Sequence, residues 1–200
     1  PMGLSYFIFQ AVGYVIDVYR GKTDAQKNPL RYGLFVSFFP QMVQGPISRY
    51  DQLAPQLTAK RSLDWRDLKF GIQLCLWGYF KKLVIADRAA VLVNAVIKDN
   101  CPYGSAVIAS GILFYCIQLY CDFSGGIDIT RGVARLFGID MAENFRRPIF
   151  ATSLTDYWRR WHITLGAWMR DYVFYPISLS RGFGKLSRWA RTHIGGTAGK

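Results

Sequence analysis

The chain has 200 residues, 51% of them hydrophobic and 16% aromatic, and its 25 basic against 13 acidic residues leave a net charge of +12. A chain this rich in aromatics can bury enough apolar surface to offset the entropy lost on ordering, which excludes a disordered polyelectrolyte. Two classes remain: a basic soluble domain that binds nucleic acid, and a membrane protein with Lys and Arg in its loops.

Residues 1–16 and 32–48 carry no charged side chain and are the first two candidate membrane segments. The first runs into an aromatic and basic edge, D-V-Y-R-G, typical of a span that meets lipid headgroups, so we predict a shortened transmembrane helix. In the second, Pro40 and Pro46 would break a regular helix. We predict a broken or re-entrant segment that faces the inside of the protein, because irregular backbone at membrane depth must be satisfied there.

Residues 65–87 have an apolar centre interrupted by Lys81 and Lys82, and residues 88–97 continue the pattern. We predict helices that lie at the membrane interface or cross it obliquely. The mean hydropathy of the chain, +0.10, is low for a polytopic protein, and short interfacial helices would account for it.

Residues 100–121 form the longest uncharged stretch, and their number is sufficient to cross a bilayer. We predict a membrane span here. The alternative is a buried helix of a soluble core, because Ser105, Ser110 and Gln118 are polar.

The four cysteines form no C-x-x-C pair and have no neighbouring His cluster, which argues against a zinc site and against a secreted disulfide framework. We expect reduced, buried thiols at Cys75, Cys101, Cys116 and Cys121. The chain has no internal repeat and no low-complexity linker, so a single domain is the simplest organisation. No basic segment precedes the first apolar run, so a signal peptide is not expected.

Residues 120–132, YCDFSGGIDITRG, follow the predicted span directly. Asp122 and Asp128 flank Ser124 and two glycines, and we predict a loop whose glycines let backbone approach a neighbour closely. Ionisable residues at a membrane edge are costly and suggest function. The two carboxylates indicate a metal only weakly, because the sequence offers no third ligand, and helix capping by Asp122 and Ser124 is the alternative.

Residues 153–176, SLTDYWRRWHITLGAWMRDYVFYP, begin with capping-box spacing and lie between prolines, so we predict one helix of about five turns. At about 100° per residue, an apolar stripe faces away from most of the arginines. His162 falls at the edge of this stripe, near Trp158 and Met169. The predicted stripe consists of Trp158, Trp161, Leu165, Met169 and Tyr172.

His162 is the candidate for chemistry. An imidazole that is partly desolvated and beside Arg159 should stay neutral near pH 7 and could take a proton from a hydroxyl. The alternative is a histidine that is hydrogen-bonded to a backbone carbonyl and packed by tryptophan. His193, in a basic glycine-rich tail, is expected to be a loop residue. Residues 146–200 hold ten Lys or Arg against two Asp, which favours a cytoplasmic position for the basic loops.

The order of five segments resembles the membrane-bound O-acyltransferase (MBOAT) family, in particular its bacterial branch of alginate O-acetyltransferases and D-alanyl teichoic acid transfer proteins. The segments are GLSYFIFQAVGYVIDVYRG, FFPQMVQGPISRYDQLAPQL, GYFKKLVIAD, QLYCDFSGGIDITRGVARLFGIDMAENFRRP and YWRRWHITLGAWMRDYVFYP. The resemblance implies an all-α, polytopic membrane fold with transmembrane, re-entrant and interfacial helices around a funnel or tunnel.

The same resemblance implies an O-acyltransferase of the bacterial cytoplasmic membrane. An acyl group, most simply acetyl, would pass from a cytoplasmic thioester, acyl-coenzyme A or acyl carrier protein, to a hydroxyl of an extracytoplasmic polysaccharide or cell-wall polymer. A second extracytoplasmic acyltransferase could complete the transfer. No bound cofactor, metal or nucleic acid is implied.

His162 falls on the histidine of the family's W-H segment, for which the resemblance implies a supporting catalytic role. The family's principal histidine belongs to a later W-H-G-type motif that nothing up to Lys200 matches. We therefore expect residues 1–200 to be a partial domain that lacks the first helices and that later segment, and to be inactive alone. Substrate-positioning roles are expected for Asp122, Ser124, Asp128, Asn144, Arg159 and Trp161.

The sequence departs from the family's usual DFSGYSD-type pattern at Gly126, Ile127 and Arg131, which leaves the acceptor open. A transporter or channel is a second hypothesis, with Lys81, Asp122 and Asp128 along a polar pathway. A third is a soluble nucleic-acid-binding domain, which needs aromatics and arginines on one exposed face. In the predicted 153–176 helix these two groups lie on opposite faces.

Overall fold

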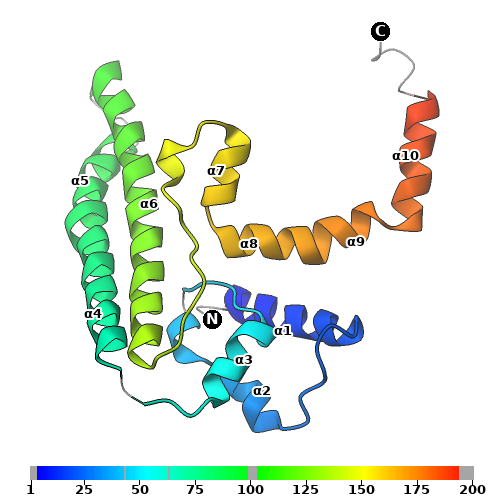
Figure 1. The fold of residues 1–200 in the computed structure, drawn as a ribbon. Helices are drawn as coiled ribbons and strands as arrows, with labels where there is room; N and C mark the ends of the chain where they lie inside the picture. The colour runs from blue at the N-terminus through cyan, green and yellow to red at the C-terminus, as the bar shows by residue number, and fades with distance from the viewer. Residues whose placement is uncertain (1–3, 43, 63, 99–102, 194–200) are drawn as a thin grey trace.

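The computed structural model describes residues 4–42, 44–62, 64–98 and 103–193, and this part of the chain is built of helices without a strand. The predicted all-α class is therefore confirmed for these residues. The elements, which Figure 1 shows in chain order, are α1 (Leu4–Tyr19), α2 (Pro29–Val36), η1 (Phe39–Gln41), α3 (Tyr50–Thr58), α4 (Trp65–Tyr79), η2 (Phe80–Ala86), α5 (Asp87–Val96), α6 (Ser105–Leu136), η3 (Pro148–Phe150), α7 (Leu154–Arg160), α8 (Ile163–Trp168), η4 (Met169–Phe174), α9 (Tyr175–Ser178) and α10 (Arg181–His193).

Two long helical rods form one side of the molecule (Figure 1). The π-helix η2 joins α4 to α5 without a turn, and this composite rod packs along α6. The predicted loop at 120–132 is wrong, because these residues continue α6 as regular helix. The helical conformation is favoured over a loop because the glycines allow α6 to pack closely against α4 and η2, and this contact does not require a break in the helix.

Glycines on facing turns set the distance between the two rods. A Cβ on Gly78 would lie 2.6 Å from the carbonyl oxygen of Gly125, and a Cβ on Gly125 would lie 2.8 Å from that of Gly78. Gly71 and Gly132 form a second such pair, with distances of 2.8 and 2.7 Å. The predicted close approach of backbone is therefore confirmed, although it occurs between helices.

The predicted break in residues 32–48 is confirmed: α2 ends at Val36, and Pro40 lies in the short helix η1. The segment also faces inward, as expected, because Phe35, Phe38 and Gln41 are buried. Phe35 and Phe38 join Leu53 of α3 in one apolar cluster beneath the rods, which also contains Val36, Ala134, Ile139 and Met141. This cluster anchors the base of α6.

The helix α6 is long and apolar enough to cross a membrane, and it is the one such helix among the described residues. Its most apolar window has a mean hydropathy of 1.6, and 11% of that window is buried. A helix in a soluble core passes the same length test but is mostly covered, so the exposure of α6 favours the predicted span over the core alternative. Residues 6–19 of α1 form a shorter apolar helix.

Two further predictions, for His193 and for the thiol groups, differ from the structure. His193 ends helix α10 and stacks on Trp189 at 5.1 Å, so its assignment to a loop is wrong. Cys116 is exposed on the apolar face of α6, whereas Cys121 is buried and Cys75 is half-buried. Cys101 lies outside the described residues. The expectation of buried thiols is therefore wrong for Cys116, because it lines an open cavity between α6 and the residues of η3 and α7.

Replacing Gly78 with Ala should destabilise the protein by about 1–3 kcal/mol, because the new methyl group overlaps the backbone of α6 and forces the rods apart. Thermal unfolding of the full-length protein in detergent measures this. Gly33→Ala is the matched control, since Gly33 is also helical and has no atom within 4 Å of its Cβ position. Equal melting temperatures for the two variants would contradict the glycine contact.

Candidate functional site

His162 lies at a break between two helices. The predicted cap at Ser153 forms, since Ser153 Oγ accepts a hydrogen bond from the amide of Asp156 at 3.1 Å, although the Asp156 carboxylate accepts in return from the amide of Thr152 at 3.2 Å. The helix nevertheless ends at Arg160, and His162 adopts left-handed backbone angles (φ 45°, ψ 55°) before α8 starts. The predicted single helix over 153–176 is therefore wrong. A non-glycine residue in this region is uncommon and is found often at functional sites.

Tertiary hydrogen bonds hold the break open. Residues 144–146 run beside residues 160–163, with an isolated bridge between Phe145 and Trp161. The amide of Arg146 donates to the carbonyl of Arg160 at 2.9 Å, and the amide of Ile163 donates to that of Asn144 at 3.0 Å. The strand-like segment thus takes over backbone groups that a continuous helix would have paired internally.

Because the helix is broken, the predicted apolar stripe is also wrong. Trp158 and Met169 are exposed, whereas Tyr172 and the unpredicted Trp168 are buried. The break changes the rotation of everything after residue 162, so a single helical wheel cannot describe both halves.

Aromatic rings surround the imidazole, but they differ from the predicted neighbours. The ring of Phe123 lies edge-on to His162 with centroids 4.9 Å apart, and the Phe145 ring lies 6.4 Å away. Trp161 packs against Phe145 at 4.9 Å and stacks on Tyr157 at 5.7 Å. Sequence reasoning missed the two phenylalanines, although both lie in motifs that were singled out for other residues.

The imidazole is half-buried, and its Nδ1 has no hydrogen-bond partner among the described residues. Burial lowers the pKa of His162 below its ordinary value of 6.5, which agrees with the predicted neutral ring. Nδ1 makes no hydrogen bond to the carbonyl of a neighbouring residue in the described part of the chain, and the ring's contact with its own backbone opposes the effect of burial on the pKa without cancelling it. A neutral ring with a free nitrogen can accept or pass on a proton.

Asn144 connects the bridge to α8 and to the inward-facing segment. It is fully buried, and its Oδ1 accepts from the amide of Thr164 at 2.9 Å and from the Thr164 hydroxyl at 2.7 Å. The Thr164 oxygen in turn accepts from the amide of Ile47 at 3.0 Å. Asn144 therefore positions the turn that carries His162, and Thr164 is a residue that sequence reasoning missed.

The predicted residues of α6 face the other rod. Lys81 is buried; its Nζ lies 2.6 Å from Asp128 and donates to Ser124 Oγ at 3.0 Å. Lys82 lies 2.6 Å from Asp122 in a more exposed pair. Each carboxylate is thus matched to a lysine, and these contacts link α6 to η2. Of residues 120–132, it is Phe123 whose ring packs against the imidazole of His162.

Arg159 is exposed and forms no ion pair with the described residues, whereas its neighbour Arg160 bonds Asp156 at 2.9 Å. A cavity of about 490 Å³ lies beside Trp161, and Tyr120, Tyr157 and Ser153 line it. The predicted site residue Trp161 therefore lines an open pocket, whereas its neighbour His162 is not part of the lining.

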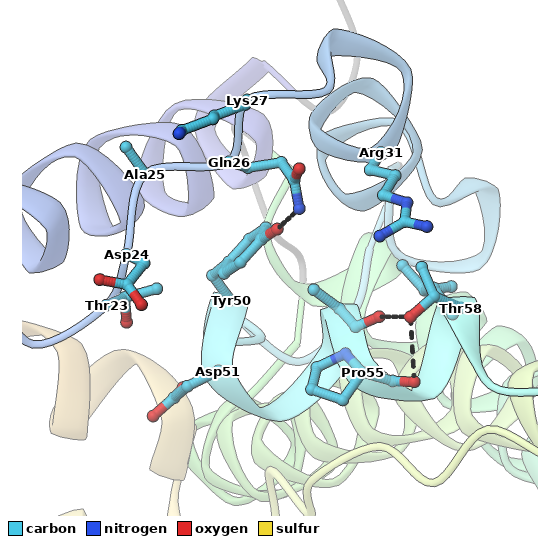
Figure 2. A pocket seen from close by; sticks show the side chains of 12 residues that line it. Thr23, Asp24, Ala25, Gln26, Lys27, Arg31, Tyr50, Asp51, Pro55 and Thr58 are labelled. Atoms are coloured by element: carbon cyan, nitrogen blue, oxygen red, sulfur yellow. Dashed lines mark hydrogen bonds between the residues drawn. The ribbon is translucent and has the colours of Figure 1, made fainter.

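A second cavity, of about 550 Å³, lies far from these residues in sequence, between the 23–31 loop and α3 (Figure 2). Gln26 donates to the Tyr50 hydroxyl at its edge, at 2.8 Å. Its lining mixes acidic and basic side chains and includes none of the predicted site residues, so we do not assign it to the His162 site.

Lys81→Ala should destabilise the full-length protein by about 3 kcal/mol, because it removes the close ammonium from the largely buried Asp128 and leaves only Arg131, at 3.8 Å, as an ion-pair partner among the described residues. Lys82→Ala is the matched control and should cost about 1 kcal/mol or less, since both members of its pair with Asp122 are substantially exposed. Unfolding in detergent compares them, and equal losses would show that burial does not distinguish the two pairs.

Folding stability should fall as the pH drops below 6.5. The unfolded chain protonates its histidine near pH 6.5, whereas the folded protein resists protonation of His162 until a lower pH. The contribution is therefore complete above 6.5 and declines as the pH falls towards the folded pKa. Melting temperatures between about pH 7.5 and pH 5 should drop more for wild type than for His162→Gln. Parallel curves would refute the burial effect.

The sequence of this chain is similar to that of known proteins. Residues 20–194 match the family model described as MBOAT, membrane-bound O-acyltransferase family. A probable alginate O-acetylase AlgI of Pseudomonas syringae is 38% identical over 193 residues, which cover 94% of this chain and 36% of that protein.

Two further relatives act on other polymers by their names. A peptidoglycan O-acetyltransferase of Helicobacter pylori is 32% identical over 90% of this chain and 39% of its own length. A teichoic acid D-alanyltransferase of Bacillus subtilis is 32% identical over 86% of this chain and 44% of its own length. The chain thus spans less than half the length of these relatives. It belongs to the membrane-bound O-acyltransferase family.

Proposed function

We propose that the protein is a multi-pass membrane O-acyltransferase that moves an acyl group from a cytoplasmic thioester to a hydroxyl of an extracytoplasmic polysaccharide or cell-wall polymer. The observation that carries this is the family match over residues 20–194, together with relatives whose names specify acetyl or D-alanyl transfer to such polymers. Three different polymers appear among these names, so the acceptor class is supported more firmly than any one polymer.

The chemistry is an acyl transfer. The acceptor oxygen attacks the thioester carbonyl carbon and forms the ester bond, while the carbon–sulfur bond breaks. A base takes the proton from the acceptor hydroxyl and passes it to the departing thiolate. A neutral imidazole suits either proton transfer or a hydrogen bond to the carbonyl oxygen. The half-buried ring of His162, whose pKa is lowered by burial, supports a role of this kind.

We propose that the other predicted site residues hold the histidine and the substrate in place and do not react themselves. Asn144 fixes the turn before α8, and Trp161, next to His162 in the chain, lines the pocket that Tyr120 and Tyr157 also line. We propose that the acceptor enters from this pocket, because stacked aromatic rings and hydroxyl groups suit a sugar ring. Asp122, Ser124 and Asp128 would then act by holding α6, and with it Phe123, against the histidine.

We further propose a bacterial cytoplasmic membrane location. The exposed apolar face of α6 supports one span, and the short apolar α1 supports another segment at the membrane. A carrier protein or coenzyme A would deliver the acyl group, most simply acetyl. A second acyltransferase outside the membrane could pass it to the polymer.

His162→Ala in the full-length protein should lower polymer acylation by about a hundredfold, the usual scale for loss of a group that transfers a proton. Ester content after mild alkaline release measures the product. His193→Ala is the matched control and should retain activity, since that histidine lies at the exposed end of α10. Unchanged acylation at equal protein level would remove His162 from the mechanism, and a wild-type protein that acylates no polymer would refute the function.

A further inference from the structure

A third cavity, separate from His162, lies where the end of α1 meets η4 and α9, and its volume is about 410 Å³. Arg20, Lys22 and Arg49 supply three cationic side chains to its wall, against the carboxylates of Asp17 and Asp171. None of these residues has a role in the mechanism above.

Both carboxylates are already engaged inside the wall. Asp17 is buried and accepts a hydrogen bond from the Tyr172 hydroxyl at 2.6 Å. Asp171 pairs with Arg49 and also lies 3.1 Å from Arg170. Both acidic groups that line the cavity therefore have partners, and so does Arg49, one of the three cations.

Arg20 and Lys22 keep hydrogen-bond capacity. Arg20 donates to the backbone carbonyl of Asp171 at 3.2 Å and has no ion pair within the described residues. Lys22 lies 3.8 Å from Asp17, a long contact, and its side chain is 44% exposed. Two cations with free donors at the mouth of one cavity provide the charge and geometry that an anionic phosphate requires.

The cavity and His162 lie at two points along one helical run. In Figure 1, α8 continues through η4 into α9 as a single rod. Asp171 and Tyr172 therefore lie no more than about 14 Å along the axis from His162, since the rise is about 1.5 Å per residue in α8 and smaller in the π-helix η4. A pantetheine arm, which is longer than that rise, separates the phosphate of a biological thioester from its reactive carbonyl.

We propose that Arg20 and Lys22 bind the phosphate of the thioester donor and so direct its acyl group towards His162. The inference rests on the proposed function for the identity of the ligand. Coenzyme A and a phosphopantetheinyl carrier protein share this phosphate, and both occur on the cytoplasmic side. Basic loops also favour that side, and Arg20 begins such a loop.

Binding of 4′-phosphopantetheine and of pantetheine to the full-length protein tests the phosphate contact without turnover. Wild type should bind the phosphorylated compound at least about tenfold more tightly, and Arg20→Gln or Lys22→Gln should each weaken it by about tenfold. The double variant R20Q/K22Q should bind both compounds equally. Lys69→Gln is the matched control, because it removes an exposed charge on α4 far from the cavity.

Kinetics with different donors then distinguish the source of the phosphate. If coenzyme A is the donor, R20Q/K22Q should raise KM for acetyl-coenzyme A and leave kcat near wild type. If a carrier is the donor, the same change should appear with the acetylated carrier protein instead.

The two proposals fail separately. Equal affinity of wild type for phosphopantetheine and pantetheine, or equal binding of phosphopantetheine by wild type and R20Q/K22Q, overturns the phosphate site even if acyl transfer proceeds. Absence of acyl transfer from every donor overturns the proposed function, and the binding comparison still decides whether the cavity recognises phosphate.

Discussion

The close approach of α6 to the α4–η2 rod is the constraint on which the rest of the structure depends. Gly78 and Gly125 remove the side chains that would hold the backbones apart, and Lys81 can then reach Asp128 and Ser124 across the contact. A buried ion pair is costly to form unless its geometry is good, and the glycines provide that geometry. Phe123, the residue before Ser124, is thereby set against His162.

The histidine site is assembled from segments that are distant in the chain. Residue 123 comes from α6, residues 144–146 from the connection that follows it, and residues 161–164 from the break before α8. Thr164 extends the network to the amide of Ile47 in the broken inward-facing segment. A change in any of these elements would move the imidazole, so the site behaves as one tertiary unit.

The basic side chains fall into two groups: some form ion pairs within the protein, and others remain available to a ligand. The lysines of η2 are satisfied by carboxylates of α6, and Arg49 is satisfied by Asp171. These pairs explain why acidic residues occur in otherwise apolar helices without requiring a transport pathway. Arg20 and Lys22 differ, because the carboxylates nearest to them already have closer partners. The charge of these two side chains is therefore available at the cavity, where a diffusing anion can reach it.

Local pattern by itself determined several features of this protein: its helical class, the long apolar helix after residue 104, the broken segment around Pro40 and the cap at Ser153. These follow from periodicity, charge and proline, which act over a few residues. The motif order also identified the family.

Only the tertiary structure decided the rest. The glycines of residues 120–132 suit a loop or a helix contact equally well until a partner helix is present. The break at His162 carries no proline or glycine, and it is stabilised by backbone hydrogen bonds that join Arg160 to Arg146 and Ile163 to Asn144. Those bonds are non-local, so no helical wheel could anticipate which rings surround the imidazole or which face each half of the segment buries.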